Sequence, residues 1–186
     1  MCGIVAGITQ RNIVPILIEG LKRLEYRGYD SAGIAILDLN QHLQRRRTVG
    51  KVEVLERAIL PEALSGNIGI AHTRWATHGK PSESNAHPHI SGANIAIVHN
   101  GIIENYLPLR QELIKAGYSF ESETDTEIIA HLLNQELKKN NNFLAAVQKT
   151  VIRLEGAFAI VFLYQNEPKS LIAVRKGSPL MVGLGQ

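Results

Sequence analysis

The sequence has a single cysteine, Cys2, among its 186 residues. An internal disulfide is therefore impossible, which suits a reducing compartment. Long apolar runs are also missing, since the longest, residues 157–164, is far shorter than the about 20 residues that a membrane-spanning helix needs. The N-terminus lacks the basic segment and apolar run of a secretory signal. We therefore expect a cytoplasmic protein without a membrane partner.

A strong excess of one charge is absent as well, because the formal net charge is only +3. The one dense basic cluster consists of Arg45, Arg46 and Arg47, within a segment whose alternation is typical of an exposed strand. No nucleic-acid-binding motif accompanies this cluster. The pattern favours a solvated hairpin and predicts no nucleic-acid partner.

Cys2 is the residue on which a chemical function depends. Only Met1 precedes it, so removal of Met1 would leave a thiol and a free α-amino group on one residue. An α-amino group has a reference pKa of about 7.7–8.0, so near neutral pH part of it is unprotonated and can accept the thiol proton. Cys2 is thus a candidate N-terminal nucleophile that carries its own base. The alternatives are an inert cysteine at the start of a buried strand and a lipidated terminal cysteine.

Apolar periodicity predicts strands grouped toward both ends of the chain, with paired helices between them. This grouping argues against a parallel βαβ sheet and for an α+β protein in which helices cover antiparallel sheets. Thr124 and Glu127 have the spacing of a capping box before one of the helices. The expected strands are residues 2–8, 33–37, 41–48, 67–73, 93–99, 157–164, 170–175 and 180–184, and the expected helices are residues 13–24, 52–60, 102–117, 128–137 and 143–154.

Asn100 and Gly101 directly follow one of these strands. A side-chain amide and a backbone N–H at a strand end can form an oxyanion hole for acyl transfer. The alternative is that the Asn-Gly pair is simply a turn.

Arg74 and Asp125 are candidates for holding an amino acid. An arginine can bind a carboxylate through two hydrogen bonds, and an aspartate can pair with an ammonium group. Thr77 and His78 would add donors close to Arg74. The alternatives are a surface ion pair for Arg74 and an acid at a helix N-terminus for Asp125.

Taken in order, the motifs along the chain resemble those of the class II glutamine amidotransferases. The forms YRGYDSAG and NGIIEN are most similar to the glutaminase domain of the glucosamine-6-phosphate synthases, rather than to amidophosphoribosyltransferase, asparagine synthetase or glutamate synthase. The motifs are residues 1–5 (MCGIV), 25–33 (EYRGYDSAG), 72–78 (HTRWATH), 85–89 (NAHPH), 99–105 (HNGIIEN) and 123–127 (ETDTE).

The resemblance implies the four-layer αββα fold of the N-terminal-nucleophile hydrolases, with two stacked antiparallel sheets. It implies that Cys2 attacks the side-chain amide of L-glutamine and that Asn100 and Gly101 form the oxyanion hole. A glutamyl thioester and ammonia result, and water then releases glutamate. No cofactor or metal is implied.

The resemblance also implies a glutamine-binding set. In it, Arg74 takes the α-carboxylate and Asp125 the α-ammonium group. The remaining members, which assist Arg74 or line the site, are Thr77, His78, Arg27, Gly28 and Trp75.

As a domain, residues 1–186 correspond by this resemblance to a C-terminally truncated glutaminase domain without the sugar-phosphate isomerase domain. In the full-length enzyme of the family, a homodimer, the ammonia aminates fructose 6-phosphate to glucosamine 6-phosphate. We expect this chain by itself to perform at most the hydrolysis of glutamine.

Other functions stay open at this point. A catalytically silent glutamine-binding or regulatory module would be favoured if Met1 were retained, and another class II domain, such as that of amidophosphoribosyltransferase, is a second alternative. A zinc protein is a third, although the histidines lack a familiar ligand spacing. The histidines concerned are His72, His78, His87, His89 and His99.

Overall fold

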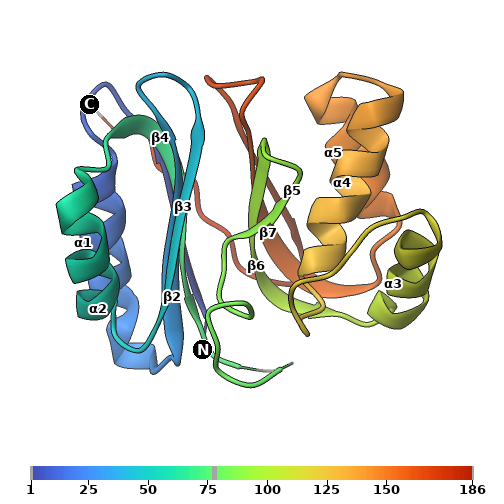
Figure 1. Ribbon diagram of the computed structural model, residues 1–186, viewed down its shortest axis with the longest axis horizontal. Helices are drawn as coiled ribbons and strands as arrows, with labels where there is room; N and C mark the ends of the chain where they lie inside the picture. Colours follow the sequence, from blue (N-terminus) through green and yellow to red (C-terminus); the bar gives the residue numbers. More distant parts are fainter. Residues whose placement is uncertain (1, 77–78, 186) are drawn as a thin grey trace.

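The computed structural model describes residues 2–76 and 79–185. Figure 1 shows four layers, with α1 and α2 outside one antiparallel sheet and α4 and α5 outside the other. The strand orders are β1-β4-β2-β3 and β5-β6-β7-β8. The predicted α+β architecture, αββα with two stacked antiparallel sheets, is confirmed.

The first sheet and its helices come from the N-terminal part of the chain, and the second from the remainder. The first half contains β1 (Gly3–Ile8), α1 (Val14–Leu24), β2 (Ser31–Asp38), β3 (Leu43–Val49), α2 (Val52–Ile59) and β4 (Gly66–Arg74). The second half contains β5 (His89–Ser91), β6 (Ile95–Ile103), α3 (Tyr106–Lys115), α4 (Glu127–Lys139), α5 (Phe143–Ile152), β7 (Gly156–Tyr164) and β8 (Leu171–Lys176). No helix in the described ranges is long and apolar enough to cross a bilayer.

β2 shows why the layers stack as they do. Successive side chains of a strand point to opposite faces. Ile34 and Ile36 pack in the cluster under α1 and α2. Ala35 and Leu37 instead belong to the cluster between the two sheets. Because both faces are covered, the strand reads as a continuous apolar run rather than as an alternating one.

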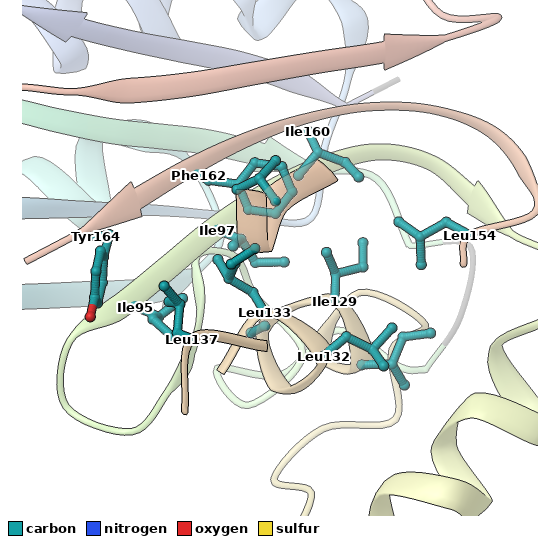
Figure 2. Close-up of a cluster of buried hydrophobic side chains, with 14 of the residues drawn as sticks. Ile95, Ile97, Ile129, Leu132, Leu133, Leu137, Leu154, Ile160, Phe162 and Tyr164 are labelled. Atoms are coloured by element: carbon teal, nitrogen blue, oxygen red, sulfur yellow. The ribbon is translucent and has the colours of Figure 1, made fainter. Parts of the chain in front are cut away.

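A third apolar layer joins the second sheet to its helices. Figure 2 shows Ile129, Leu133 and Leu137 of α4 on the side that faces the strands, with Ile97 and Phe162 opposite. The spacing of the α4 residues is that of one helical face. Removal of this apolar surface from water stabilises the packing of α4 on β6 and β7.

One expected helix boundary and one expected helix cap are wrong. Residues 102–103 belong to β6 instead of a helix, because Ile102 and Ile103 pair with Ala157 and Gly156 of β7. The expected capping box does not form either, since the carboxylate of Glu127 accepts from the backbone N–H groups of Glu121 and Ser122 instead. Strand pairing overrode the local pattern in the first place, and hydrogen bonds to the residues that precede the helix did so in the second.

Two surface expectations are also wrong. Residues 180–184 form no strand, since no described strand pairs with them, and residues 181–184 are exposed. The arginines of β3 are not simply solvated: Arg46 pairs with Glu62 at 2.5 Å, and Arg47 donates to the carbonyls of Ser84 and Ala86. β3 therefore uses its charge to tie neighbouring segments to the sheet.

Candidate active site

The layer between the two sheets is apolar at one end and polar at the other. Along β4, Ile68 and Ile70 lie in the apolar cluster between the sheets, and strand alternation carries His72 and Arg74 onto the same face. The polar end of this layer is where the candidate residues meet.

Cys2 reaches this polar end because of the register of β1. Ile4 pairs with His72 of β4 and Gly3 with Thr73, so Cys2 lies beside the end of β4. The backbone N–H of Trp75 donates to Cys2 Sγ at 3.2 Å. Burial raises the pKa of the Cys2 thiol, although the bond from Trp75 acts in the opposite direction. The thiol is therefore protonated near neutral pH and needs a base for activation.

Asn100 and Gly101 approach Cys2 from the second sheet. The Asn100 Nδ2 donates to the backbone carbonyl of Cys2 at 3.3 Å, and its Oδ1 lies 2.8 Å from His72 Nε2. Gly101 has φ +131°, a conformation that favours glycine. The pair lies inside β6, so the alternative of a simple turn is wrong.

Arg74 is buried at the end of β4 and has partners on both sides. Its guanidinium lies 3.5 Å from an Asp30 carboxylate oxygen and donates to the carbonyl of Gly79 at 3.0 Å. The other Asp30 oxygen accepts from the backbone N–H of Ala76 at 2.5 Å. Because Asp30 contacts both Arg74 and Ala76, it fixes Arg74 relative to the segment that follows β4. The alternative of a surface ion pair is wrong, because Arg74 is only 3% exposed.

Asp125 lies in the segment before α4 and is also buried. One carboxylate oxygen accepts from the backbone N–H of Ile103 at 2.8 Å, which joins this segment to β6. Glu127 holds the same segment from the other side. Burial alone would raise the pKa of Glu127, but hydrogen bonds from His131, Glu121 and Ser122 outweigh it and lower the pKa to about 2. The ionised Glu127 therefore holds residues 121 and 122 of this segment against the start of α4.

A group of buried histidines surrounds the site. The rings of His72 and His87 stack with centroids 4.2 Å apart, and His89 meets His87 edge-on at 4.7 Å. Thr126 Oγ1 joins His87 Nε2 and His99 Nδ1, at 3.0 and 2.9 Å. Burial lowers the pKa of His72 and of His89 to about 3, and lowers that of His87 well below its usual range. These three rings are neutral in the folded protein.

The neutral histidines predict a loss of stability on mild acidification. An unfolded histidine has a pKa of about 6.5, so below that pH the unfolded chain binds protons that the folded protein does not. The free energy of unfolding should therefore fall as the pH drops from 7 to 5. The contribution of each buried ring to this slope approaches about 1.4 kcal/mol per pH unit. Urea unfolding at several pH values measures this slope.

His89 and His42 provide a matched pair for that measurement. His89→Gln should reduce the slope by the contribution of one proton, about 1.4 kcal/mol per pH unit, because it removes one buried ring. His42→Gln is the control, because the His42 side chain is 68% exposed and its replacement removes no buried ring. A free energy of unfolding that is constant from pH 7 to 5 would contradict the prediction.

A small cavity is lined by five of the ten candidate residues. It encloses about 20 Å³, roughly room for one water molecule. Cys2, Trp75, Gly101, Arg74 and Asp125 all line it. The complete lining comprises Cys2, Arg74, Trp75, His87, His99, Gly101, Thr124, Asp125 and Thr126.

The remaining candidates lie around this cavity or outside the described residues. Gly28 contacts the Trp75 ring so closely that a Cβ on Gly28 would lie 2.7 Å from Trp75 Cζ3. Arg27 is exposed, and its Nε donates to the Tyr26 hydroxyl at 3.0 Å. The predictions for Thr77 and His78 fall on residues outside the described ranges.

Several residues of the site were not proposed as catalytic or glutamine-binding residues from the sequence. Thr124 and Thr126 flank Asp125 in its motif, and their hydroxyls bond to buried histidines, which a sequence pattern does not reveal. His72 could have been found by alternation, since it lies two residues after Ile70 on one face of β4. Asp30 lies in a recognised motif, but nothing local indicates its contact with Arg74.

The histidines do not form a metal centre in the described part of the chain. No three His, Cys, Asp or Glu side chains within it come together as metal ligands would. The hydrogen bonds of His72, His87 and His89 instead go to Asn100, Thr126 and Thr124.

Comparison with known proteins agrees with this arrangement. The family model described as a glutamine amidotransferase domain matches residues 72–183. A protein of Legionella pneumophila (strain Lens) named glutamine–fructose-6-phosphate aminotransferase (isomerizing) is 57% identical over 185 residues, which cover 100% of this chain and 31% of that protein. The protein of the same name from Escherichia coli (strain K12) is 56% identical, with 100% of this chain and 30% of that protein covered.

The fold is also similar to that of a glutamine amidotransferase of known structure. The glutamine phosphoribosylpyrophosphate amidotransferase of B. subtilis, complexed with ADP and GMP, has a TM-score of 0.74 and is 26% identical, with 88% of this chain and 35% of that chain covered. The present chain spans about a third of the length of the curated relatives that it matches. Since the family model matches more than half of the chain, the chain belongs to the family of glutamine amidotransferase domains.

Proposed function

We propose that this chain hydrolyses the side-chain amide of L-glutamine to glutamate and ammonia through a thioester on Cys2. One observation carries the proposal: a thiol, a buried arginine and a buried aspartate line the same cavity. These are the groups that a reaction at the side chain of a free α-amino acid requires. The arginine suits the carboxylate, the aspartate suits the ammonium group, and the thiol suits the amide carbon.

Activation of Cys2 depends on a base, because burial raises the pKa of its thiol. Removal of Met1 supplies one in the α-amino group of Cys2. This amine accepts the thiol proton as sulfur bonds to the amide carbon of glutamine, and it then protonates the departing nitrogen. Ammonia leaves, and a glutamyl thioester remains. Water activated by the same amine adds to the thioester, and glutamate leaves as the thiol re-forms.

Each addition step places negative charge on the former carbonyl oxygen. Asn100 Nδ2 and the backbone N–H of Gly101 are the donors proposed for this oxyanion. Asn100 is already next to the nucleophile, since its Nδ2 bonds to the Cys2 carbonyl. Donors held in place before the reaction stabilise the transition state without a reorganisation cost during it.

Recognition of glutamine rests on Arg74 for the α-carboxylate and Asp125 for the α-ammonium group, with Thr77 and His78 as further donors. Both charged side chains have their orientation fixed by other contacts, to Asp30 and to the Ile103 N–H respectively. A cavity of about 20 Å³ is smaller than glutamine, so binding requires its wall to open. Trp75, which is 53% exposed and packs on Gly28 beside Arg27, is a part of that wall that reaches solvent.

For the whole protein, we propose the activity that the relatives' names describe. There the ammonia would aminate fructose 6-phosphate to glucosamine 6-phosphate in a sugar-phosphate isomerase domain, within a cytoplasmic homodimer. Identity of 57% to the aminotransferase, against 26% to the phosphoribosylpyrophosphate amidotransferase, favours this assignment over the alternative. For the 186-residue chain, glutamine hydrolysis is the function to test.

The test is release of glutamate and ammonia from L-glutamine, with L-asparagine as the matched control. Asparagine carries the same groups but is one methylene shorter, so its amide carbon falls short of Cys2 when Arg74 and Asp125 hold the α-carbon. We expect hydrolysis of glutamine and a kcat/KM for asparagine lower by at least about 100-fold. Equal rates for the two amides, or none for either, would refute the proposed function.

A further inference from the structure

The hydrogen bond between His72 and Asn100 connects the two sheets at the site. His72 belongs to β4 and Asn100 to β6, and His72 Nε2 lies 2.8 Å from Asn100 Oδ1. We propose that His72 is a positioning residue, which holds the Asn100 amide with its nitrogen toward the substrate. The inference rests on the proposed function, because it assigns a support to the oxyanion donor of that reaction.

A side-chain amide has two ends of opposite hydrogen-bonding character. With Oδ1 toward His72, Asn100 directs Nδ2 to the carbonyl of Cys2 at 3.3 Å and so toward the nucleophile. A rotated amide would place Oδ1 there instead. Two oxygens with partial negative charge would then face each other in the transition state, and stabilisation would become repulsion. Catalysis therefore requires one of the two orientations.

The protonation state of His72 selects that orientation. The ring is wholly buried and stacked on His87, so its plane is fixed. A neutral ring carries one proton. With the proton on Nε2, the ring donates to Asn100 Oδ1. Its Nδ1 then carries no proton.

The opposite arrangement is less favourable. With the proton on Nδ1, the lone pair of Nε2 would face Asn100 Oδ1, and two acceptors would meet. The Asn100 amide would then have to rotate and would lose the bond from its Nδ2 to the carbonyl of Cys2. His72 thus donates from Nε2 and holds Asn100 in the working orientation.

Two substitutions of His72 separate this role from simple packing. The amide nitrogen of a glutamine reaches about as far along the side chain as Nε2 of histidine, whereas that of an asparagine reaches only as far as Nδ1. His72→Gln should therefore retain the donor to Asn100, and His72→Asn should lose it. We expect kcat for glutamine hydrolysis to fall roughly 10- to 100-fold in His72→Asn and to stay within about threefold of the unaltered chain in His72→Gln.

KM and thiol reactivity report whether the rest of the site is intact. Arg74 is held by Asp30 and Gly79, and Asp125 by the Ile103 N–H, so KM should change by less than about twofold in both variants. The rate of alkylation of Cys2 by iodoacetamide should also be unchanged, because that reaction forms no oxyanion. A KM that rises together with the loss of kcat, or a folded His72→Gln that loses kcat as His72→Asn does, would overturn the inference.

An Asn100→Ala background gives the decisive comparison. If His72 acts through Asn100, His72→Asn should lower kcat no further in the chain that already lacks the Asn100 amide. Effects that multiply would overturn the inference and leave the proposed function standing. A folded, unaltered chain that does not hydrolyse glutamine would overturn both.

Discussion

Cys2→Ala is expected to abolish glutamine hydrolysis, with a fall in kcat of roughly 10⁴- to 10⁶-fold. The substitution removes the only thiol of the chain and thereby the atom that forms the thioester. Neighbouring groups are unaffected sterically, because alanine is smaller than cysteine. Ammonia release from glutamine measures the effect, and a thermal unfolding midpoint close to that of the unaltered chain would show that the fold is retained.

Intact mass gives an independent measurement of the same chemistry. The unaltered chain should lack Met1 and should gain a single adduct from the glutamine-like electrophile 6-diazo-5-oxo-L-norleucine. Cys2→Ala should gain none. Turnover that persists in Cys2→Ala would contradict the proposed mechanism, and a chain that retains Met1 and gains no adduct would favour the silent glutamine-binding module.

How much of the fold was predictable depends on where the signal lies. β2 and β7 are continuous apolar segments of the length of a strand, so their position follows from composition and periodicity. The end of β6 does not. Its last residues, Asn100 to Ile103, pair with β7, which lies more than 50 residues further along the chain. Local preference cannot reveal a boundary that a distant strand determines.

The candidate site divides in the same way. Cys2, Arg74 and Asp125 could be predicted because the chemistry of each residue type, and the motifs around them, indicate a role. The contacts that orient them could not. Asp30 meets Arg74 across 44 positions, and Asp125 meets the Ile103 N–H across 22. A sequence read alone gives the chemical groups of a site, and the register of the strands gives their positions.

The predicted capping box before α4 shows a further limit of prediction from the sequence. Thr124 and Glu127 satisfy the spacing of a capping box, yet the Thr124 hydroxyl bonds to Ser122 and His89. Glu127 accepts from the backbone of Glu121 and Ser122, upstream of the helix. The same residue types therefore fold the segment back toward the cavity, which places Asp125 there.

Gly101→Ala is expected to destabilise the fold strongly. A Cβ at this position would lie 2.1 Å from the carbonyl oxygen of Ala157 and 2.8 Å from Phe158 Cα, both backbone atoms of the paired strand. The φ of +131° is also unfavourable for alanine. Because β6 must move away from β7 or change its backbone, the free energy of unfolding should fall by about 3 kcal/mol or more. For a chain of this size the thermal midpoint should drop by roughly 6–12 °C.

Gly117→Ala is the matched control for this effect. Gly117 has φ +89°, but a Cβ there would meet nothing within 4 Å. The control thus contains the conformational penalty without the collision, and it should destabilise by only about 1–2 kcal/mol. Glutamine hydrolysis separates the two variants further, since Gly101→Ala displaces both oxyanion donors even at temperatures where the chain is folded, whereas Gly117 lies after α3, away from the cavity lining. Equal destabilisation by the two substitutions would show that strain at φ > 0 accounts for the need for glycine, and that the close approach of β6 to β7 does not.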